Sequence, residues 1–185
     1  MKILVLYGTT EGQTRKIADF VTTRLKNRGD VVALIDAMDT PWDLQPQDYD
    51  AAILAGSLHV GVYQKPLIHF ARKHADALNK MPTAFLSVSL SAAGKDPDDL
   101  KGMAACADLF VKETGWKPGE IDHIAGAFRF TEYDFFKRWV MKIIAWERGM
   151  KTKGVIELEL TDWDALGKLV DTFHERATAA RKHAA

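Results

Sequence analysis

Five short apolar runs alternate with stretches of helical periodicity along the chain. The runs cover residues 3–7, 31–35, 51–55, 83–88 and 121–128, and the helical patterns cover residues 17–25, 67–78, 98–114 and 162–181. Parallel strands are joined by crossover helices that cover both faces of the sheet, so the strands read as continuous apolar runs. The pattern predicts an α/β fold, a doubly wound five-stranded parallel sheet with helices on both faces.

A loop rich in hydroxyl groups and glycine separates the first apolar run from the first helix. Its threonines and its glutamine can donate hydrogen bonds, next to free backbone N–H groups at the positive end of the helix dipole. Gly8 and Gly12 allow the backbone to approach an oxyanion closely. The alternative is an ordinary turn in which one threonine caps the helix. We favour a phosphate site formed by Thr9, Thr10, Glu11, Gly12, Gln13 and Thr14.

This loop is neither a P-loop nor a dinucleotide-binding loop, because it lacks Gly-Lys-Ser/Thr and the three glycines of G-x-G-x-x-G. Two further loops should converge on it, because open α/β sheets bind ligands beyond the carboxyl ends of their strands. These loops cover residues 56–64 and 87–94. Tyr63 either stacks on a flat ligand or packs against the following helix. His59 either touches the ligand or faces solvent.

Composition narrows the class of protein. The 185 residues include 25 basic and 25 acidic side chains, a balance that argues against nucleic acid as a partner. The single cysteine, Cys106, excludes an internal disulfide, and no spacing of histidine and cysteine suggests a metal site. Without a linker-like stretch, residues 1–185 read as one domain. Neither a signal peptide nor a membrane-spanning run is visible, so we expect a cytoplasmic protein or one peripheral on the cytoplasmic face of the inner membrane.

The segment of residues 130–153 precedes the last helix and combines aromatic with basic residues. Residues 132–153 hold six basic and three acidic side chains, a net charge of 6 − 3 = +3. At helical spacing, Phe135, Trp139 and Trp146 share one face, whereas Lys137 and Lys142 lie opposite. The segment is either a helix packed on the sheet or an amphipathic helix that meets a membrane interface or a planar substrate.

The loop Thr9-Thr10-Glu11-Gly12-Gln13-Thr14 resembles the flavodoxin loop that holds the phosphate of FMN. Glu11 departs from the generic flavodoxin pattern. An acidic residue at this position of the loop resembles the menaquinone-dependent protoporphyrinogen IX dehydrogenases, a branch of the flavodoxin-like proteins. Residues 128–133, 136–144 and 160–163 also resemble this branch. Arginine is common there at the position of His59. The resemblance extends from residue 3 to about residue 175.

The resemblance implies FMN as cofactor and places the isoalloxazine ring between the second and third loops. The residues implied for the second loop are Ser57, Leu58, His59, Val60, Gly61 and Tyr63. Those implied for the third loop are Ser87, Val88, Ser89, Leu90, Ser91 and Ala92. The flavin performs the redox chemistry, and no side chain is assigned as a catalytic acid or base.

The resemblance also implies an activity, the oxidation of protoporphyrinogen IX to protoporphyrin IX with electrons passed to menaquinone or ubiquinone. Two other functions stay open at this point. One is a flavodoxin that only carries electrons, although such carriers are usually acidic and this chain has no net charge. The other is an NAD(P)H:quinone oxidoreductase, although no second nucleotide-binding motif is visible. The sequence leaves the oligomeric state and the choice of quinone open.

Overall fold

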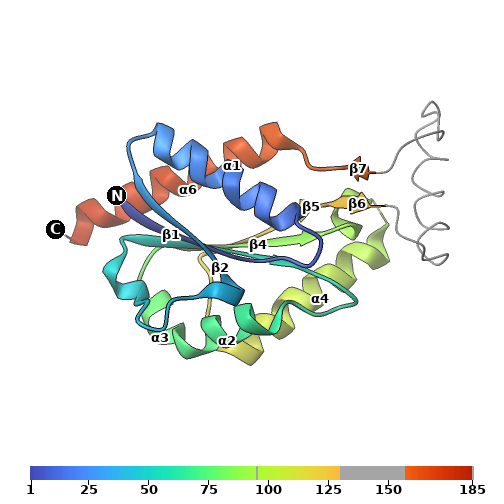
Figure 1. The fold of residues 1–185 in the computed structure, drawn as a ribbon, viewed down its shortest axis with the longest axis horizontal. Helices are drawn as coiled ribbons and strands as arrows, with labels where there is room; N and C mark the ends of the chain where they lie inside the picture. The colour runs from blue at the N-terminus through green and yellow to red at the C-terminus, as the bar shows by residue number, and fades with distance from the viewer. Residues whose placement is uncertain (95, 130–156, 185) are drawn as a thin grey trace.

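A single parallel sheet forms the centre of the protein. The computed structural model describes residues 1–94, 96–129 and 157–184 (Figure 1). The strands are β1 (Lys2–Gly8), β2 (Val31–Asp36), β3 (Ala51–Ser57), β4 (Thr83–Ser89) and β5 (Glu120–Ala125), in the spatial order β2-β1-β3-β4-β5. All neighbouring pairs are parallel. The predicted doubly wound five-stranded sheet is confirmed.

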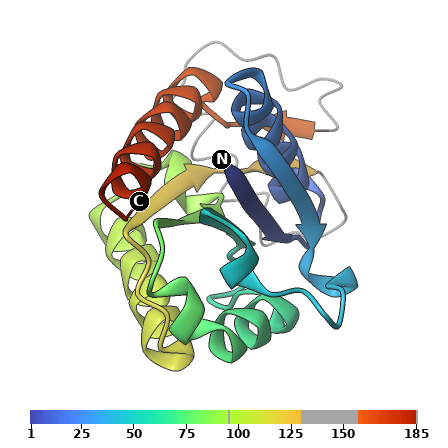
Figure 2. The ribbon, with the colours of Figure 1, turned by 90° about the vertical axis from the view of Figure 1, so that its left-hand side faces the viewer.

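Helices cover both faces of this sheet (Figures 1 and 2). Helices α1 (Gln13–Asn27) and α6 (Trp163–Ala184) lie on one face, and α2 (Lys65–Lys73), α3 (Ala75–Leu78) and α4 (Pro97–Thr114) lie on the other. Alternate residues of a strand point to opposite faces, so Ile3 and Val5 pack with α1 and α6, whereas Leu4 and Leu6 pack with α2 and α4. Both faces are therefore apolar, as the continuous apolar runs predicted.

Short 3-10 turns occupy three of the connections: η1 (Ala37–Asp39), η2 (Pro46–Asp48) and η3 (Ser91–Ala93). The helix predicted over residues 67–78 is divided into α2 and α3, because His74 has φ −113° and ψ 16° and leaves the helical conformation. Cys106 lies on α4, as expected, and is half-buried. None of the helices in the described ranges is long and apolar enough to cross a membrane.

The strand predicted over residues 121–128 is two strands. After β5, the chain passes through Gly126 into β6 (Ala127–Arg129), which pairs antiparallel with β7 (Glu157–Glu159). At Gly126 the backbone changes its hydrogen-bonding partner. The N–H of Gly126 donates to the C=O of Ser89 in β4, and its C=O accepts from the N–H of Leu160, which follows β7. The expected amphipathic helix of residues 132–153 lies outside the described residues. Strands β6 and β7 flank this part of the sequence at the carboxyl end of the sheet (Figure 1).

Candidate functional site

The three loops expected to bind a ligand follow β1, β3 and β4, three adjacent strands of the parallel sheet. The carboxyl ends of parallel strands lie at one edge of a sheet, so the loops meet there. Backbone hydrogen bonds join two of them directly, since the N–H of Leu58 donates to the C=O of Val88 over 2.7 Å. The predicted convergence of the loops is confirmed at the level of the backbone.

The first loop leaves the start of α1 open. Gly12 has φ +92°, a left-handed conformation that favours glycine, and its N–H donates to Thr9 Oγ1 over 2.9 Å. No described side chain caps α1. The first turn of a helix has N–H groups without partners inside the helix and carries the positive end of the dipole. This helix start is therefore suited to an anion.

Thr14 lies in the first turn of α1 and is only 1% exposed. Its hydroxyl group is buried and has no hydrogen-bond partner within the described part of the chain. An unsatisfied buried hydroxyl costs about 1–3 kcal/mol, whereas a phosphate oxygen beside it would accept its proton. The residues of this loop therefore fit the phosphate group of FMN.

Gln13 is directed to another part of the chain. Its Nε2 donates to Thr161 Oγ1 over 2.9 Å, and Thr161 Oγ1 in turn donates to the C=O of Ala125 over 2.7 Å. The side-chain amide that the sequence assigned to the phosphate thus connects the start of α1 to the end of β5 and to the segment before α6. An ion pair of 3.5 Å between Lys16 of α1 and Glu159 of β7 adds a second connection nearby.

A further amide connects the first loop to the second. Gln64 lies directly before α2, and its Nε2 donates to Thr10 Oγ1 over 2.9 Å and to the C=O of Ser57 over 3.0 Å. The N–H of Ser57 donates back to Gln64 Oε1 over 3.2 Å. Thr10 and Glu11 are both exposed. Gln64 is not among the site residues that the sequence predicts.

The second loop carries a tight turn with exposed apolar side chains. His59 and Val62 form an antiparallel bridge, and between them Val60 and Gly61 have φ values of +49° and +79°. Val60 is 84% exposed and Val62 is 62% exposed. His59 and Gly61 are also exposed, whereas Ser57 and Leu58 are half-buried. His59 is exposed at the surface of the loop, a position compatible with both alternatives, contact with a ligand or with solvent.

Tyr63 packs in the core. It is 5% exposed and lies edge-on against Phe85 and Phe110, with ring centroids 5.1 Å apart in both pairs. Its hydroxyl is 2.8 Å from Ser87 Oγ, which is fully buried. Burial raises the pKa of Tyr63 to about 12, so the phenol stays neutral. Of the two alternatives for Tyr63, packing describes its position: its ring partners belong to β4 and α4, and it shares a core cluster with Leu67 of the following helix, α2.

The third loop combines buried and accessible residues. Val88 and Ser89 are buried, and Ser89 Oγ lies 2.9 Å from Met103 Sδ and accepts from the N–H of Ala92 over 3.2 Å. Leu90, Ser91 and Ala92 are half-buried. The predicted residues of the second and third loops therefore form two groups. One group is buried beneath the surface of the two loops: Tyr63, Ser87, Val88 and Ser89. The other predicted residues of these loops are accessible to a ligand.

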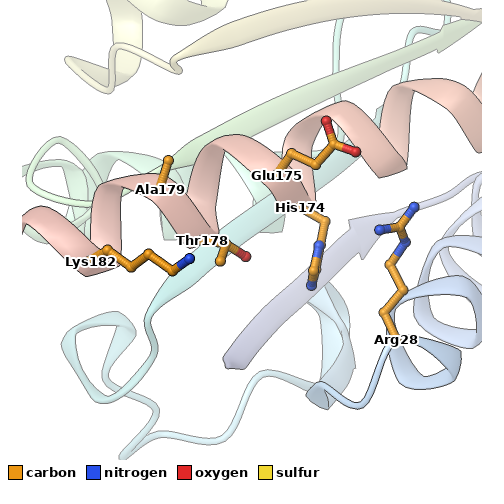
Figure 3. A pocket seen from close by; sticks show the side chains of 6 residues that line it. All are labelled: Arg28, His174, Glu175, Thr178, Ala179 and Lys182. Atoms are coloured by element: carbon orange, nitrogen blue, oxygen red, sulfur yellow. The ribbon is translucent and has the colours of Figure 1, made fainter.

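A hollow of about 450 Å³ lies elsewhere, between the end of α1 and the second half of α6 (Figure 3). Its lining residues are Arg28, His174, Glu175, Thr178, Ala179 and Lys182. Beside it, His174 Nε2 lies 3.1 Å from Asp30 Oδ2. Since α1 begins at the phosphate loop and ends here, the hollow is remote from the three loops. None of the residues predicted to bind FMN lines it.

Comparisons with known proteins agree with this geometry. Residues 4–154 match the family model of the flavodoxin domain, Flavodoxin_5. The protoporphyrinogen IX dehydrogenase [quinone] of Escherichia coli K12 is 34% identical over 166 residues, covering 89% of this chain and 90% of the relative. The chain belongs to the flavodoxin-domain family, in the branch of the quinone-linked protoporphyrinogen IX dehydrogenases.

Two further matches extend the assignment to this family. A protoporphyrinogen IX dehydrogenase [quinone] of Leishmania major is 30% identical over 176 residues, covering 93% of this chain and 74% of the relative. Among solved structures, a short-chain flavodoxin associated with a bacterial microcompartment aligns with a TM-score of 0.59 at 14% identity, covering 96% of this flavodoxin domain and 99% of that chain. The second match confirms the flavodoxin fold, and the first confirms the predicted branch.

Two residues outside the predicted set emerge from the structure, Gln64 and Thr161. A sequence signal existed for both, because Gln64 ends the second loop and Thr161 lies in the stretch 160–163 that resembles the dehydrogenase branch. Their partners, Thr10 and Gln13, are 54 and 148 residues away in the sequence. Contacts over such separations depend on the folded arrangement, which a motif does not show.

Proposed function

We propose that this flavodoxin domain binds FMN and oxidises protoporphyrinogen IX to protoporphyrin IX, with a quinone as electron acceptor. The observation that carries the proposal is the similarity to protoporphyrinogen IX dehydrogenases over 89% of the chain. This similarity includes the stretch beyond β5, in which a plain flavodoxin differs from the dehydrogenases. The flavodoxin structure matches at only 14% identity and shows the fold alone, whereas the 34% identity to the dehydrogenase favours this activity over electron carriage.

The site supports the same proposal. The open helix start and the hydroxyl of Thr14 suit the phosphate group, and the accessible residues of the second and third loops suit a flat ring. When bound, FMN supplies the redox chemistry, accepting electrons from the porphyrinogen and passing them to the quinone. The chain binds and orients the ring and the substrate, and we assign no side chain as a proton donor or acceptor.

The surface beside the proposed ring site favours a substrate with an apolar face. Val60 and Val62 expose 84% and 62% of their surface on the turn of the second loop. Contact with an apolar macrocycle would remove the surface of these two valines from water, which is favourable. We infer that this turn lies against the porphyrinogen or the quinone, and that His59 reaches the same area from the start of the turn.

Contact with the cytoplasmic face of a membrane belongs to the same proposal. Quinones reside in the bilayer, and residues 132–153 carry a net charge of +3 together with five aromatic residues. Basic residues attract anionic headgroups, and aromatic residues suit the membrane interface. This support comes from the sequence alone.

The decisive experiment is an assay of the purified protein reconstituted with FMN. Protoporphyrin fluorescence should rise when protoporphyrinogen IX is supplied together with menaquinone or ubiquinone, and it should rise much more slowly without quinone under anaerobic conditions. Chromatography of the heat-released cofactor should identify FMN and not FAD. A protein that retains FMN but gives no quinone-dependent oxidation would support the carrier function instead.

A further inference from the structure

Gln64 makes three hydrogen bonds, which use both N–H protons of its side-chain amide and one lone pair of its oxygen. Nε2 donates one proton to Thr10 Oγ1 (2.9 Å) and the other to the C=O of Ser57 (3.0 Å), while Oε1 accepts from the N–H of Ser57 (3.2 Å). The opposite orientation of the amide would place N–H against N–H and C=O against C=O at Ser57. The contacts with Ser57 therefore fix which group points at Thr10.

The absence of a side chain at Gly8 makes this arrangement possible. A Cβ atom added at Gly8 would lie 2.9 Å from Gln64 Oε1 and 3.2 Å from Gln64 Cβ. The first of these distances is too short for any residue other than glycine without a shift of the amide. The end of β1 thus leaves room for Gln64 to reach from the start of α2 to the phosphate loop.

The donor from Gln64 determines what the hydroxyl of Thr10 can do. A threonine hydroxyl has one proton to donate and two lone pairs to accept with. Since Thr10 Oγ1 accepts from Gln64, its own proton is not required for that bond and remains available to an acceptor. Thr9 Oγ1 is in the same state, because it accepts from the N–H of Gly12. Both hydroxyls are thereby prepared to donate to an anion.

We propose that Gln64 is a positioning residue for the FMN phosphate, which holds Thr10 as a hydrogen-bond donor and couples the phosphate loop to the ring-binding loop at Ser57. The inference rests on the proposed binding of FMN. Gln64 itself does not need to touch the cofactor. Its effect passes through Thr10 on one side and through the backbone of Ser57 on the other.

A change to glutamate tests the direction of the hydrogen bond while preserving the shape of the side chain. In Gln64→Glu, the carboxylate accepts the proton of Thr10, opposes the C=O of Ser57 and adds a negative charge near the phosphate. The affinity for FMN should fall about ten- to a hundredfold, as expected for losing a hydrogen bond to a charged group. Riboflavin, which has no phosphate group, should lose less affinity than FMN, only the part that passes through Ser57 to the ring-binding loop.

Gln64→Met tests the same role without a new charge. This variant should weaken FMN binding by about threefold to thirtyfold, because Thr10 then has no donor to fix its orientation. In a double-mutant cycle, Thr10→Val should have a smaller effect on FMN affinity in the Gln64→Met background than in the parent. Additive effects would show that Gln64 does not act through Thr10 and would overturn the proposal.

The matched control is Gln47→Glu, an exposed glutamine on η2 whose amide donates to Gln45 and which has no contact with the three loops. Fluorescence titration with FMN and with riboflavin is the readout, and thermal unfolding of the flavin-free proteins shows that each variant is folded. Equal losses for the two flavins, or no loss of FMN affinity, would contradict the proposal. A parent that binds FMN but does not oxidise protoporphyrinogen IX would contradict the proposed function only, because these titrations do not depend on turnover.

Discussion

Thr14 and Thr22 both bury a hydroxyl group that has no partner in the described part of the chain. Both residues lie on α1, but only Thr14 belongs to its first turn, next to the phosphate loop. We therefore expect the hydroxyl beside the helix start to bind the phosphate and the hydroxyl of Thr22 only to pack. This pair offers an internal comparison at the scale of single residues.

We expect Thr14→Val to reduce the affinity for FMN by about ten- to a hundredfold, equivalent to about 1.5–3 kcal/mol, because one hydrogen bond to a charged group is lost. The flavin-free protein should keep or slightly increase its stability, since valine has the same shape and removes an unsatisfied polar group. Thr22→Val serves as control and should leave FMN affinity unchanged. Similar FMN affinities for Thr14→Val and the parent would show that the phosphate binds elsewhere.

The turn at Val60 stores backbone strain. A β-branched residue at φ +49° is unfavourable, and such strain costs on the order of 1–3 kcal/mol. Val60→Gly should therefore raise the free energy of unfolding by about 1 kcal/mol in denaturant titrations. Val62→Gly, which removes a side chain from the extended bridge, should not. If neither variant gains stability, the turn is not strained.

If Val60 also contacts the substrate, as proposed, Val60→Gly should raise KM.

At this scale, the sequence predicted positions better than roles. The hydroxyl groups of Thr9, Thr10 and Thr14 were recognisable because they are close together between an apolar run and a helix. The burial of Tyr63 was not, because it depends on Phe85 and Phe110 from two other elements. The same limit applies to Gln64, whose partner Thr10 lies in a different loop.

Among the elements, the strands of the parallel sheet were the most predictable. Strands β2, β3 and β4 extend the apolar runs at residues 31–35, 51–55 and 83–88 by one or two residues at their ends. The division of β5 from β6 was not predicted, because apolar residues continue through Gly126 and only the pairing partner changes. Strand β7 has three residues and pairs about 30 residues back along the chain, so local periodicity gives little sign of it.

Strand β5 forms an edge of the sheet and carries a carboxyl group in an unfavourable environment. Burial, and then the neighbouring Glu120 carboxylate, raises the pKa of Asp122 from 3.8 to about 6, with Arg176 acting in the opposite direction. Its Oδ2 atom is buried without a hydrogen-bond partner in the described part of the chain. The folded protein thus holds this proton more tightly than the unfolded chain, so the group stabilises the fold most below about pH 4, and this contribution is lost as the pH rises through about 6.

Asp122→Asn should therefore increase the free energy of unfolding at pH 7.5 by about 1–2 kcal/mol, a value reduced for the partial exposure of the side chain. The difference from the parent should be much smaller at pH 4, where the aspartate is protonated in the folded state and close to half protonated in the unfolded chain. Urea unfolding at the two pH values measures this change. Asp43→Asn, at an exposed position, is the control and should show no such difference. An equal effect of Asp122→Asn at both pH values would contradict the account.

At the scale of the whole molecule, one edge of the sheet gathers the features that the proposed function needs. The phosphate loop, the exposed turn at Val60 and the base formed by β6 and β7 all lie at the carboxyl end of the sheet (Figure 1). Gln13 and Thr161 connect the phosphate loop to the segment after β7. Strands β6 and β7, which flank residues 130–156 in the sequence, therefore lie at the same edge of the sheet as the proposed cofactor site.

This arrangement predicts how the protein responds to anionic vesicles. If the basic residues of the segment at 132–153 meet anionic headgroups, the parent protein should pellet with such vesicles, and binding should weaken with salt as the Debye length shortens from about 8 Å near physiological ionic strength.

The variant Lys137→Glu/Arg138→Glu/Lys142→Glu should bind FMN normally, because none of the three belongs to the described FMN loops, but it should lose vesicle binding and turnover with membrane-embedded quinone. A short-chain, water-soluble quinone analogue should restore its turnover, because delivery from the bilayer is then no longer needed. Full turnover of the variant with membrane-embedded quinone, or no binding of the parent to vesicles, would show that this segment does not dock the protein on the membrane.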